Sequence, residues 1–172
     1  MDTVPPTPAF ASETDALHML DSVLGYLAAA DPTRVPTAIQ ARCLTVLERA
    51  GARLTAARAS YLSAFNASQG YREDGAYSAR SWLIHQTRVT KGTAARHTGW
   101  DRRLRAHPRL AAVLAAGELT ESYAAAVCHW TGQLPEDCRD SADAILTGAA
   151  LTGMDLRDLA ALRTFAQRWL AP

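Results

Sequence analysis

The apolar residues between Ile39 and Phe65 recur every three or four positions, the spacing that places side chains on one face of an α-helix. A single long helix over about residues 36–66 accommodates all of them. The members of this stripe are Ile39, Cys43, Leu47, Ala50, Leu54, Ala57, Tyr61 and Phe65. Another face of the same helix carries Arg42, Arg49 and Arg53. We interpret this second face as a solvated helix surface.

Alanine extends the helical bias to the whole chain, since it fills 35 of the 172 positions and is the best helix former. Runs of β-branched and aromatic residues at a period of two, which would indicate strands, are missing. We therefore expect an all-α fold: a single-domain bundle of about seven to eight helices, with one long helix and a helix-turn-helix-like pair. Residues 1–11 are expected to form a flexible N-terminal segment, and residues 12–172 the helical domain.

Capping and turn residues predict where the helices begin and end. Serine, threonine and aspartate stabilise helix starts, proline suits a first turn, and glycine often ends a helix. The predicted starts are Ser12 or Thr14, about Pro36, Ser78, Thr90, Pro108, Thr120, Pro135 and Asp155. The corresponding ends are near Asp31, Asn66, Thr87, Ala106, Gly117, Gly132, Leu151 and Leu170. An Asp74-Gly75 turn is expected before the third helix.

Basic residues concentrate between Gly70 and Arg109, although the whole chain carries a formal net charge of only +1. The segment holds Arg72, Arg80, Arg88, Lys91, Arg96, Arg102, Arg103, Arg105 and Arg109, against Glu73, Asp74 and Asp101. Nine basic and three acidic side chains give it a charge of about +6. The stretch from Glu118 to Asp158 is acidic instead. A positive helical segment is a starting point for binding a polyanion.

Residues 82–97 resemble a helix-turn-helix, with Arg88-Val89-Thr90 as the turn. Val89 is expected to point into the joint, and Ala94 to let the two helices pack closely. In such pairs the second helix enters the major groove of DNA. Lys91 and Arg96 would contact phosphates or guanines, and the phosphate anchors would be Arg88, Arg102, Arg103 and Arg105. An ordinary helical hairpin with a solvated basic rim fits the same pattern.

Two positions depart from the usual helix-turn-helix pattern. Arg88 occupies a turn position where glycine is common, and His97 a position where a buried aliphatic residue is expected. Gly99 lies inside the second helix and is expected to bend or fray it, since glycine lowers helix stability by about 1 kcal/mol relative to alanine.

Neither metal nor catalytic chemistry is indicated by the remaining polar residues. The five histidines show no HxxxH, HExxH or zinc-finger spacing, and no nucleotide-binding glycine motif occurs. Cys128 is expected to be a buried core residue, and Trp82, Trp100, Trp130 and Trp169 to be core anchors. We therefore expect no enzyme activity, no cofactor, no metal and no small-molecule substrate.

The three cysteines, Cys43, Cys128 and Cys138, show no disulfide framework, which favours a reducing cytosol. The N-terminus lacks the basic start of a signal peptide, and no apolar run reaches the roughly 18 residues of a membrane span. These features predict a cytoplasmic protein without a membrane partner.

Two blocks of residues resemble the domain of unknown function 222 family. The first block is Gly70-Tyr71-Arg72-Glu73-Asp74-Gly75 with Ser78 and Trp82-Leu83. The second comprises Val89-Thr90, Ala94, Arg96, Leu104, Pro108, Leu114, Gly117-Glu118-Leu119-Thr120, Ala124 and Leu134-Pro135-Glu136. The resemblance covers residues 12–171. It implies the N-terminal helical module of actinobacterial proteins that end in an HNH endonuclease domain.

The resemblance transfers no catalytic residue, because the His-Asn-His motif and its cysteine pairs are absent from residues 1–172. The chain is then either a stand-alone module or part of a longer nuclease. We expect a non-catalytic, DNA-associated module that positions a linked or partner HNH nuclease on duplex DNA. A protein-interaction or oligomerisation module, including a homodimer, remains the alternative, because the long helix and the segregated charges suit it.

Overall fold

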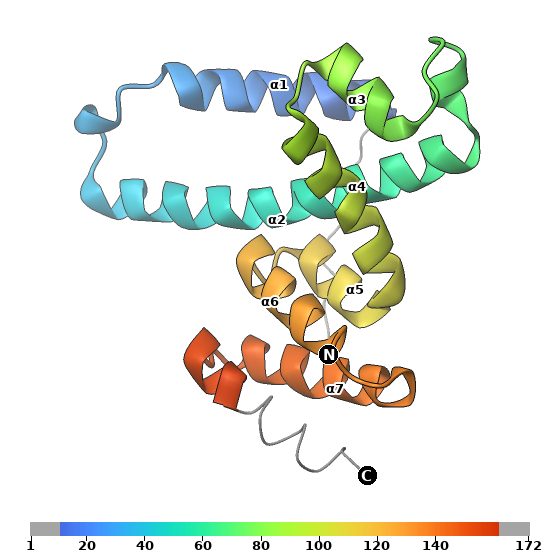
Figure 1. The fold of residues 1–172 in the computed structure, drawn as a ribbon. Helices are drawn as coiled ribbons and strands as arrows, with labels where there is room; N and C mark the ends of the chain where they lie inside the picture. The colour runs from blue at the N-terminus through green and yellow to red at the C-terminus, as the bar shows by residue number, and fades with distance from the viewer. Residues whose placement is uncertain (1–10, 162–172) are drawn as a thin grey trace. The chain divides into compact units, whose positions relative to one another are not determined.

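The computed structural model describes residues 11–161, which are helical throughout apart from short connections and contain no strand (Figure 1). Residues 156–161 are also helical. The all-α prediction, with one long helix, is confirmed. The elements are α1 (Glu13–Ala29), η1 (Pro32–Arg34), α2 (Thr37–Ala67), η2 (Gly70–Arg72), α3 (Ala79–Thr87), α4 (Lys91–Ala106), α5 (Pro108–Ala116), α6 (Glu121–Thr131) and α7 (Glu136–Leu151).

The predicted capping residues start the helices. The side chains of Ser12, Ser78, Thr90 and Thr120 each accept a hydrogen bond from the backbone N–H three residues later. These bonds satisfy N–H groups that have no partner inside the helix. Asp155 accepts from two backbone N–H groups in the same way. The predicted continuation of this last helix to Leu170 extends outside the described residues.

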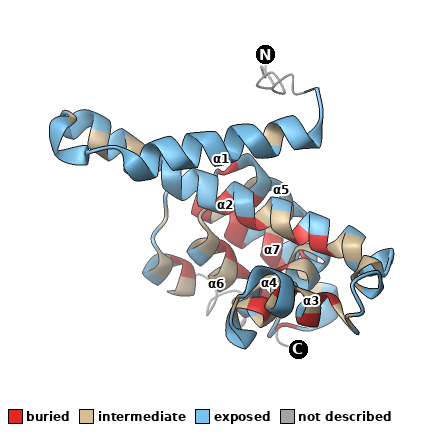
Figure 2. Ribbon diagram, turned by 90° about the horizontal axis from the view of Figure 1, so that it is seen from above, coloured by how far each residue is buried: buried red, intermediate tan, exposed pale blue. Residues whose placement is uncertain are grey.

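The chain divides into two compact units, residues 1–43 and 44–172. The division falls inside α2, so the single domain expected for residues 12–172 stays a prediction. In the first unit, Gln40 Nε2 donates to the carbonyl oxygens of Pro32 and Val35, both at 2.8 Å, and so fixes the η1 turn. None of the residues of α1 is buried, as the exposed colouring of Figure 2 shows.

The second unit has two hydrophobic clusters. The larger one joins α2 to α4, α5, α6, α7 and the following helical turn. Its buried residues are Ala52, Ala59, Trp100, Leu110, Leu114, Leu119, Ala124, Val127, Cys128, Leu146, Ala150 and Leu159. Cys128 and Trp100 are thus core residues, as the sequence predicts. Trp82 and Trp130 are half-buried against the two clusters, and Trp169 lies outside the described residues.

The smaller cluster holds α3 and the start of α4 against the C-terminal half of α2. Leu62, Ala79, Leu83 and Ala94 are buried there, with Phe65, Tyr71, Trp82, Ile84 and Val89 packed around them. The Phe65 ring meets the Trp82 ring edge to face at a centroid distance of 4.8 Å. A Cβ on Gly70 would lie only 2.6 Å from the Phe65 ring, so this close approach requires glycine.

The buried face of α2 is not the apolar stripe that the sequence emphasises. Its buried residues are Ala52, Thr55, Ala59 and Leu62, which also recur every three or four positions. The small side chains of Ala52 and Ala59 let neighbouring helices approach closely, whereas most of the larger residues of the predicted stripe remain exposed. Both sets of residues recur every three or four positions, so periodicity alone does not indicate which face of α2 is buried.

A buried polar group joins the start of α5 to α6 and α7. His107 Nδ1 lies 3.2 Å from Asp143 Oδ1, and both side chains are more than nine-tenths buried. The Thr131 hydroxyl lies 3.5 Å from the same ring nitrogen and donates to the Val127 carbonyl. Sequence spacing gives no sign of this pair, because its members lie 36 positions apart.

Candidate nucleic-acid interface

Helices α3 and α4 form the predicted pair, joined by residues 88–90. Val89 packs into the smaller hydrophobic cluster and Ala94 is completely buried there, as expected for the joint. Because alanine has a short side chain, the start of α4 can pack closely on α3. The Arg80 guanidinium adds a hydrogen bond of 3.3 Å to the Lys91 carbonyl oxygen across the pair. The turn is thereby fixed from both helices.

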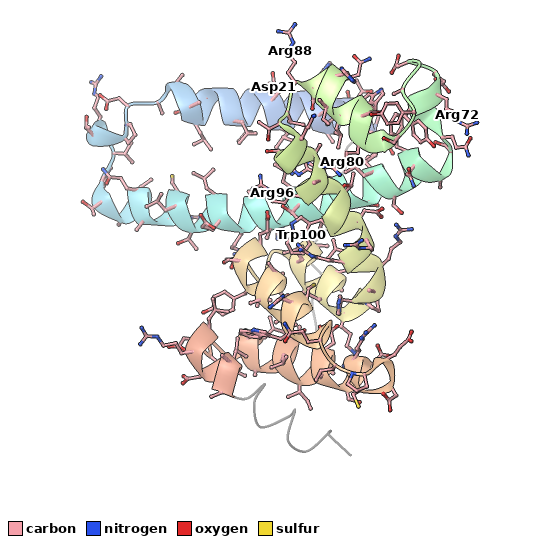
Figure 3. All side chains as sticks on the ribbon, in the orientation of Figure 1. Asp21, Arg72, Arg80, Arg88, Arg96 and Trp100 are labelled. Atoms are coloured by element: carbon pink, nitrogen blue, oxygen red, sulfur yellow. The ribbon has the colours of Figure 1, made fainter. Side chains whose placement is uncertain are left out.

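Arg88 ends α3 in the left-handed conformation, with φ 55° and ψ 25°. This is the turn position where the sequence pattern expects glycine, and an L-residue with a Cβ is strained there. The Arg88 side chain is exposed, and Figure 3 shows it extending outward from the turn. A strained position thus carries an exposed cation instead of the glycine that the backbone favours.

The exposed cations of α4 form two rows. At about 100° per residue, Lys91 and Arg102 project on one side of the exposed face, and Arg96 and Arg103 on the other. All four side chains belong to exposed residues. Gly99 lies between the rows, and a Cβ there would meet nothing within 4 Å. Contrary to expectation, Gly99 does not fray α4, which is continuous from Lys91 to Ala106.

Two of the predicted phosphate anchors already have partners. The Arg105 guanidinium forms a salt bridge of 2.7 Å with Asp101 Oδ2, and Arg103 lies over the Trp100 ring at 5.3 Å from its centroid. Within residues 11–161, no carboxylate forms an ion pair with Arg88, Lys91, Arg96 or Arg102. The Arg105 side chain is 63% exposed and that of Asp101 only 11%, so this ion pair is partly buried.

His97 adds no positive charge to this surface at neutral pH. Partial burial lowers its pKa below the ordinary value, and the nearby charges of Arg58 and Arg96 lower it further, while Glu121 opposes the shift. The position that departs from the usual aliphatic pattern therefore holds a half-buried, neutral imidazole.

Glu121 supports α4 from beneath, a role that sequence analysis missed. Its carboxylate accepts hydrogen bonds from the Thr55 hydroxyl at 2.6 Å and from the Trp100 indole N–H at 3.1 Å. One side chain of α6 thus fixes α2 and α4 together. The available signal was weak: Thr55 interrupts a run of small apolar residues at helical spacing, which indicates a buried hydroxyl in need of a partner.

The block from Gly70 to Leu83 has a structural role. Asp74 accepts a hydrogen bond of 2.6 Å from the Trp82 indole N–H, which ties the turn to α3. Gly75 has φ +70°, as the predicted Asp-Gly turn requires. Ser78 and Ser81 form a reciprocal capping box. Exposed cations lie on this block, at Arg72 and Arg80, as well as on the turn and on α4.

Metal binding, thiol reactivity at Cys128 and membrane spanning were also considered for the residues that the structure describes. No group of three His, Cys, Asp or Glu side chains there could hold a metal ion. Burial, with the charge of Asp143, raises the pKa of Cys128 to about 12, so its thiol stays protonated at neutral pH. None of the described helices is long and apolar enough to cross a bilayer.

Comparisons with protein-family models, with curated proteins and with solved structures found no match for this chain.

Proposed function

We propose that Arg88 and the two basic rows of α4 bind duplex DNA, and that the chain is a non-catalytic DNA-associated module. The observation that carries this proposal is the concentration of exposed cations on one helix and the turn before it: Arg88, Lys91, Arg96 and Arg102 are exposed there and form no ion pair within residues 11–161. Cations held on one rigid helix pair would contact the phosphates on both sides of a DNA groove.

The role in positioning an HNH nuclease is the second part of the proposal. It rests on the resemblance of the blocks at residues 70–83 and 89–136 to the domain of unknown function 222 family. The basic surface would hold DNA while a linked or partner domain cuts it. The alternative is a protein-interaction module, which the exposed large apolar side chains of α1 and α2, such as Leu17 and Leu44, favour.

Fluorescence anisotropy with a labelled duplex at a series of salt concentrations tests the DNA contact. The logarithm of the affinity should fall linearly with the logarithm of the salt concentration, by about 0.9 per phosphate contact. The pair Arg96→Ala and Arg103→Ala removes one cation-bearing row and should weaken binding and reduce this slope.

A charge-matched control separates local contacts from net charge. Arg34→Ala with Arg157→Ala removes two exposed arginines that lie outside α3 and α4. This control should retain most of the affinity. No duplex binding at low salt, or equal losses in both double variants, would contradict the proposal.

A further inference from the structure

A pocket lies between α3 and the first residue of α4. We call it the α3–α4 pocket; its volume is about 270 Å³, and it is lined by Tyr77, Ser78, Arg80, Ser81, Ile84 and Lys91. That volume is about nine times the roughly 30 Å³ that one water molecule takes up in the liquid, so a phosphate group fits inside. Of these residues, only Lys91 belongs to the cations assigned to DNA above.

The charged residues that line the α3–α4 pocket are both cations. Arg80 and Lys91 are exposed, and no acidic residue is among the lining residues. The acids closest to them in the sequence have other partners: Asp74 accepts from the Trp82 indole N–H, and Asp101 pairs with Arg105. A hollow whose walls carry charge of one sign concentrates ions of the opposite sign more strongly than a flat surface does. The pocket therefore favours an anion.

The Arg80 guanidinium is already oriented toward α4. Its hydrogen bond of 3.3 Å to the Lys91 carbonyl oxygen uses one of five N–H donors and holds the group beside α4 (Figure 3). The remaining donors form a planar fork that matches phosphate oxygens, and the Lys91 ammonium adds a second positive charge. The hydroxyls of Ser78 and Ser81 are engaged in the capping box, so the two cations are the groups that would hold the anion.

We propose that the α3–α4 pocket binds one backbone phosphate of DNA, held by both Arg80 and Lys91, with the Tyr77 hydroxyl as a further donor. This inference rests on the DNA contact proposed above. Lys91 connects the two surfaces, because it lines the pocket and also begins one row of α4. Tyr77 is 85% exposed, and tyrosine hydroxyls are common donors to phosphate. In helix-turn-helix pairs the first helix crosses the DNA backbone, which is the position that this pocket gives to α3.

Duplex affinity of single variants of the full chain is the first test, measured by fluorescence anisotropy at low salt. Arg80→Ala and Tyr77→Phe should each weaken binding by about 2- to 10-fold, as expected for the loss of one hydrogen-bonded contact. Arg72→Ala and Tyr61→Phe are the matched controls, because both residues are exposed and neither lines the pocket. These two controls should bind as the wild type does.

A double-mutant cycle shows whether Arg80 and Lys91 hold the same phosphate. If they do, the loss caused by Arg80→Ala depends on whether the Lys91 side chain is present, so the two losses should not multiply. A purely structural role of Arg80 predicts no such coupling, because its bond to the Lys91 backbone carbonyl survives in Lys91→Ala. The cycle of Arg72→Ala with Lys91→Ala is the control and should show independent losses.

Two results would overturn the pocket alone: Arg80→Ala that binds duplex as well as Arg72→Ala does, or independent losses for Arg80 and Lys91. If Arg96→Ala with Arg103→Ala still weakens binding, the DNA contact of α4 stands without the pocket. A wild type that binds no duplex at low salt would overturn both proposals. Binding of a free mononucleotide, with unchanged duplex affinity in Arg80→Ala, would assign the pocket to free nucleotides and overturn its role in DNA binding.

Discussion

Replacing Arg88 with glycine separates the conformational cost of this position from the function of its charge. The backbone of Arg88 has φ 55°, a left-handed conformation that costs an L-residue about 1–2 kcal/mol. Glycine removes this cost, but it also increases the conformational entropy of the unfolded chain, by about 0.4–1 kcal/mol. We therefore expect Arg88→Gly to raise the free energy of unfolding by about 0.5–1 kcal/mol.

The same substitution should weaken DNA binding. Loss of one phosphate contact reduces the slope of log affinity against log salt by about 0.9. Urea unfolding followed by tryptophan fluorescence measures the first effect, and anisotropy with a labelled duplex measures the second. A variant that becomes more stable but binds DNA less well would show that the Arg88 side chain contributes to DNA binding, although its backbone conformation lowers the stability.

Gln69 offers a matched control, because it is the other described non-glycine residue with positive φ, at 57°. Gln69→Gly should give a similar gain in stability without a change in DNA affinity, since no cation is removed. The reasoning on strain would be refuted if Arg88→Gly destabilised the protein. The proposed contact would be refuted if its DNA affinity equalled that of the wild type.

Three further predictions concern the packing beneath the basic surface and in the core. Ala94→Leu should destabilise the protein by about 1–3 kcal/mol in urea unfolding, because Ala94 is fully buried in the α3–α4 joint; a loss no greater than that of the half-buried Ala95→Leu would contradict this. Glu121→Ala should cost about 1–3 kcal/mol, because it leaves the Thr55 hydroxyl and the Trp100 N–H without an acceptor. An unchanged unfolding midpoint would show that this carboxylate does not tie the helices. Cys128 should react with iodoacetamide at pH 8 far more slowly than Cys43, since its raised pKa and burial keep it a protonated, shielded thiol. Equal labelling by peptide mass spectrometry would contradict the packing of the core.

Sequence analysis located the helices well because their boundaries depend on local chemistry. Caps such as Ser78 and Thr90 act through hydrogen bonds only three residues long, and Gly117 ends α5 with φ +69°. The small residue Ala94 and the apolar Val89 also indicated the α3–α4 joint correctly. These features depend on residues that are neighbours in the sequence, so a single sequence suffices to predict them.

The features that were not predicted depend on contacts between distant parts of the chain. The buried face of α2 follows from which neighbours can approach Ala52 and Ala59, and both stripes of that helix have the same period. Glu121 meets Thr55 across 66 positions, and its role is decided by tertiary packing. The salt bridge between Arg105 and Asp101 is local instead, since the two residues lie four positions apart on α4, and the prediction of a phosphate anchor at Arg105 did not consider it.

Photo-cross-linking of the full chain to a bromodeoxyuridine-substituted duplex, followed by peptide mapping, shows which residues lie against DNA. We expect cross-links within residues 88–103, on the turn and the exposed face of α4, and their loss when salt is raised. Cross-links confined to other helices, or none under conditions in which the duplex binds, would contradict the assignment of this surface to DNA.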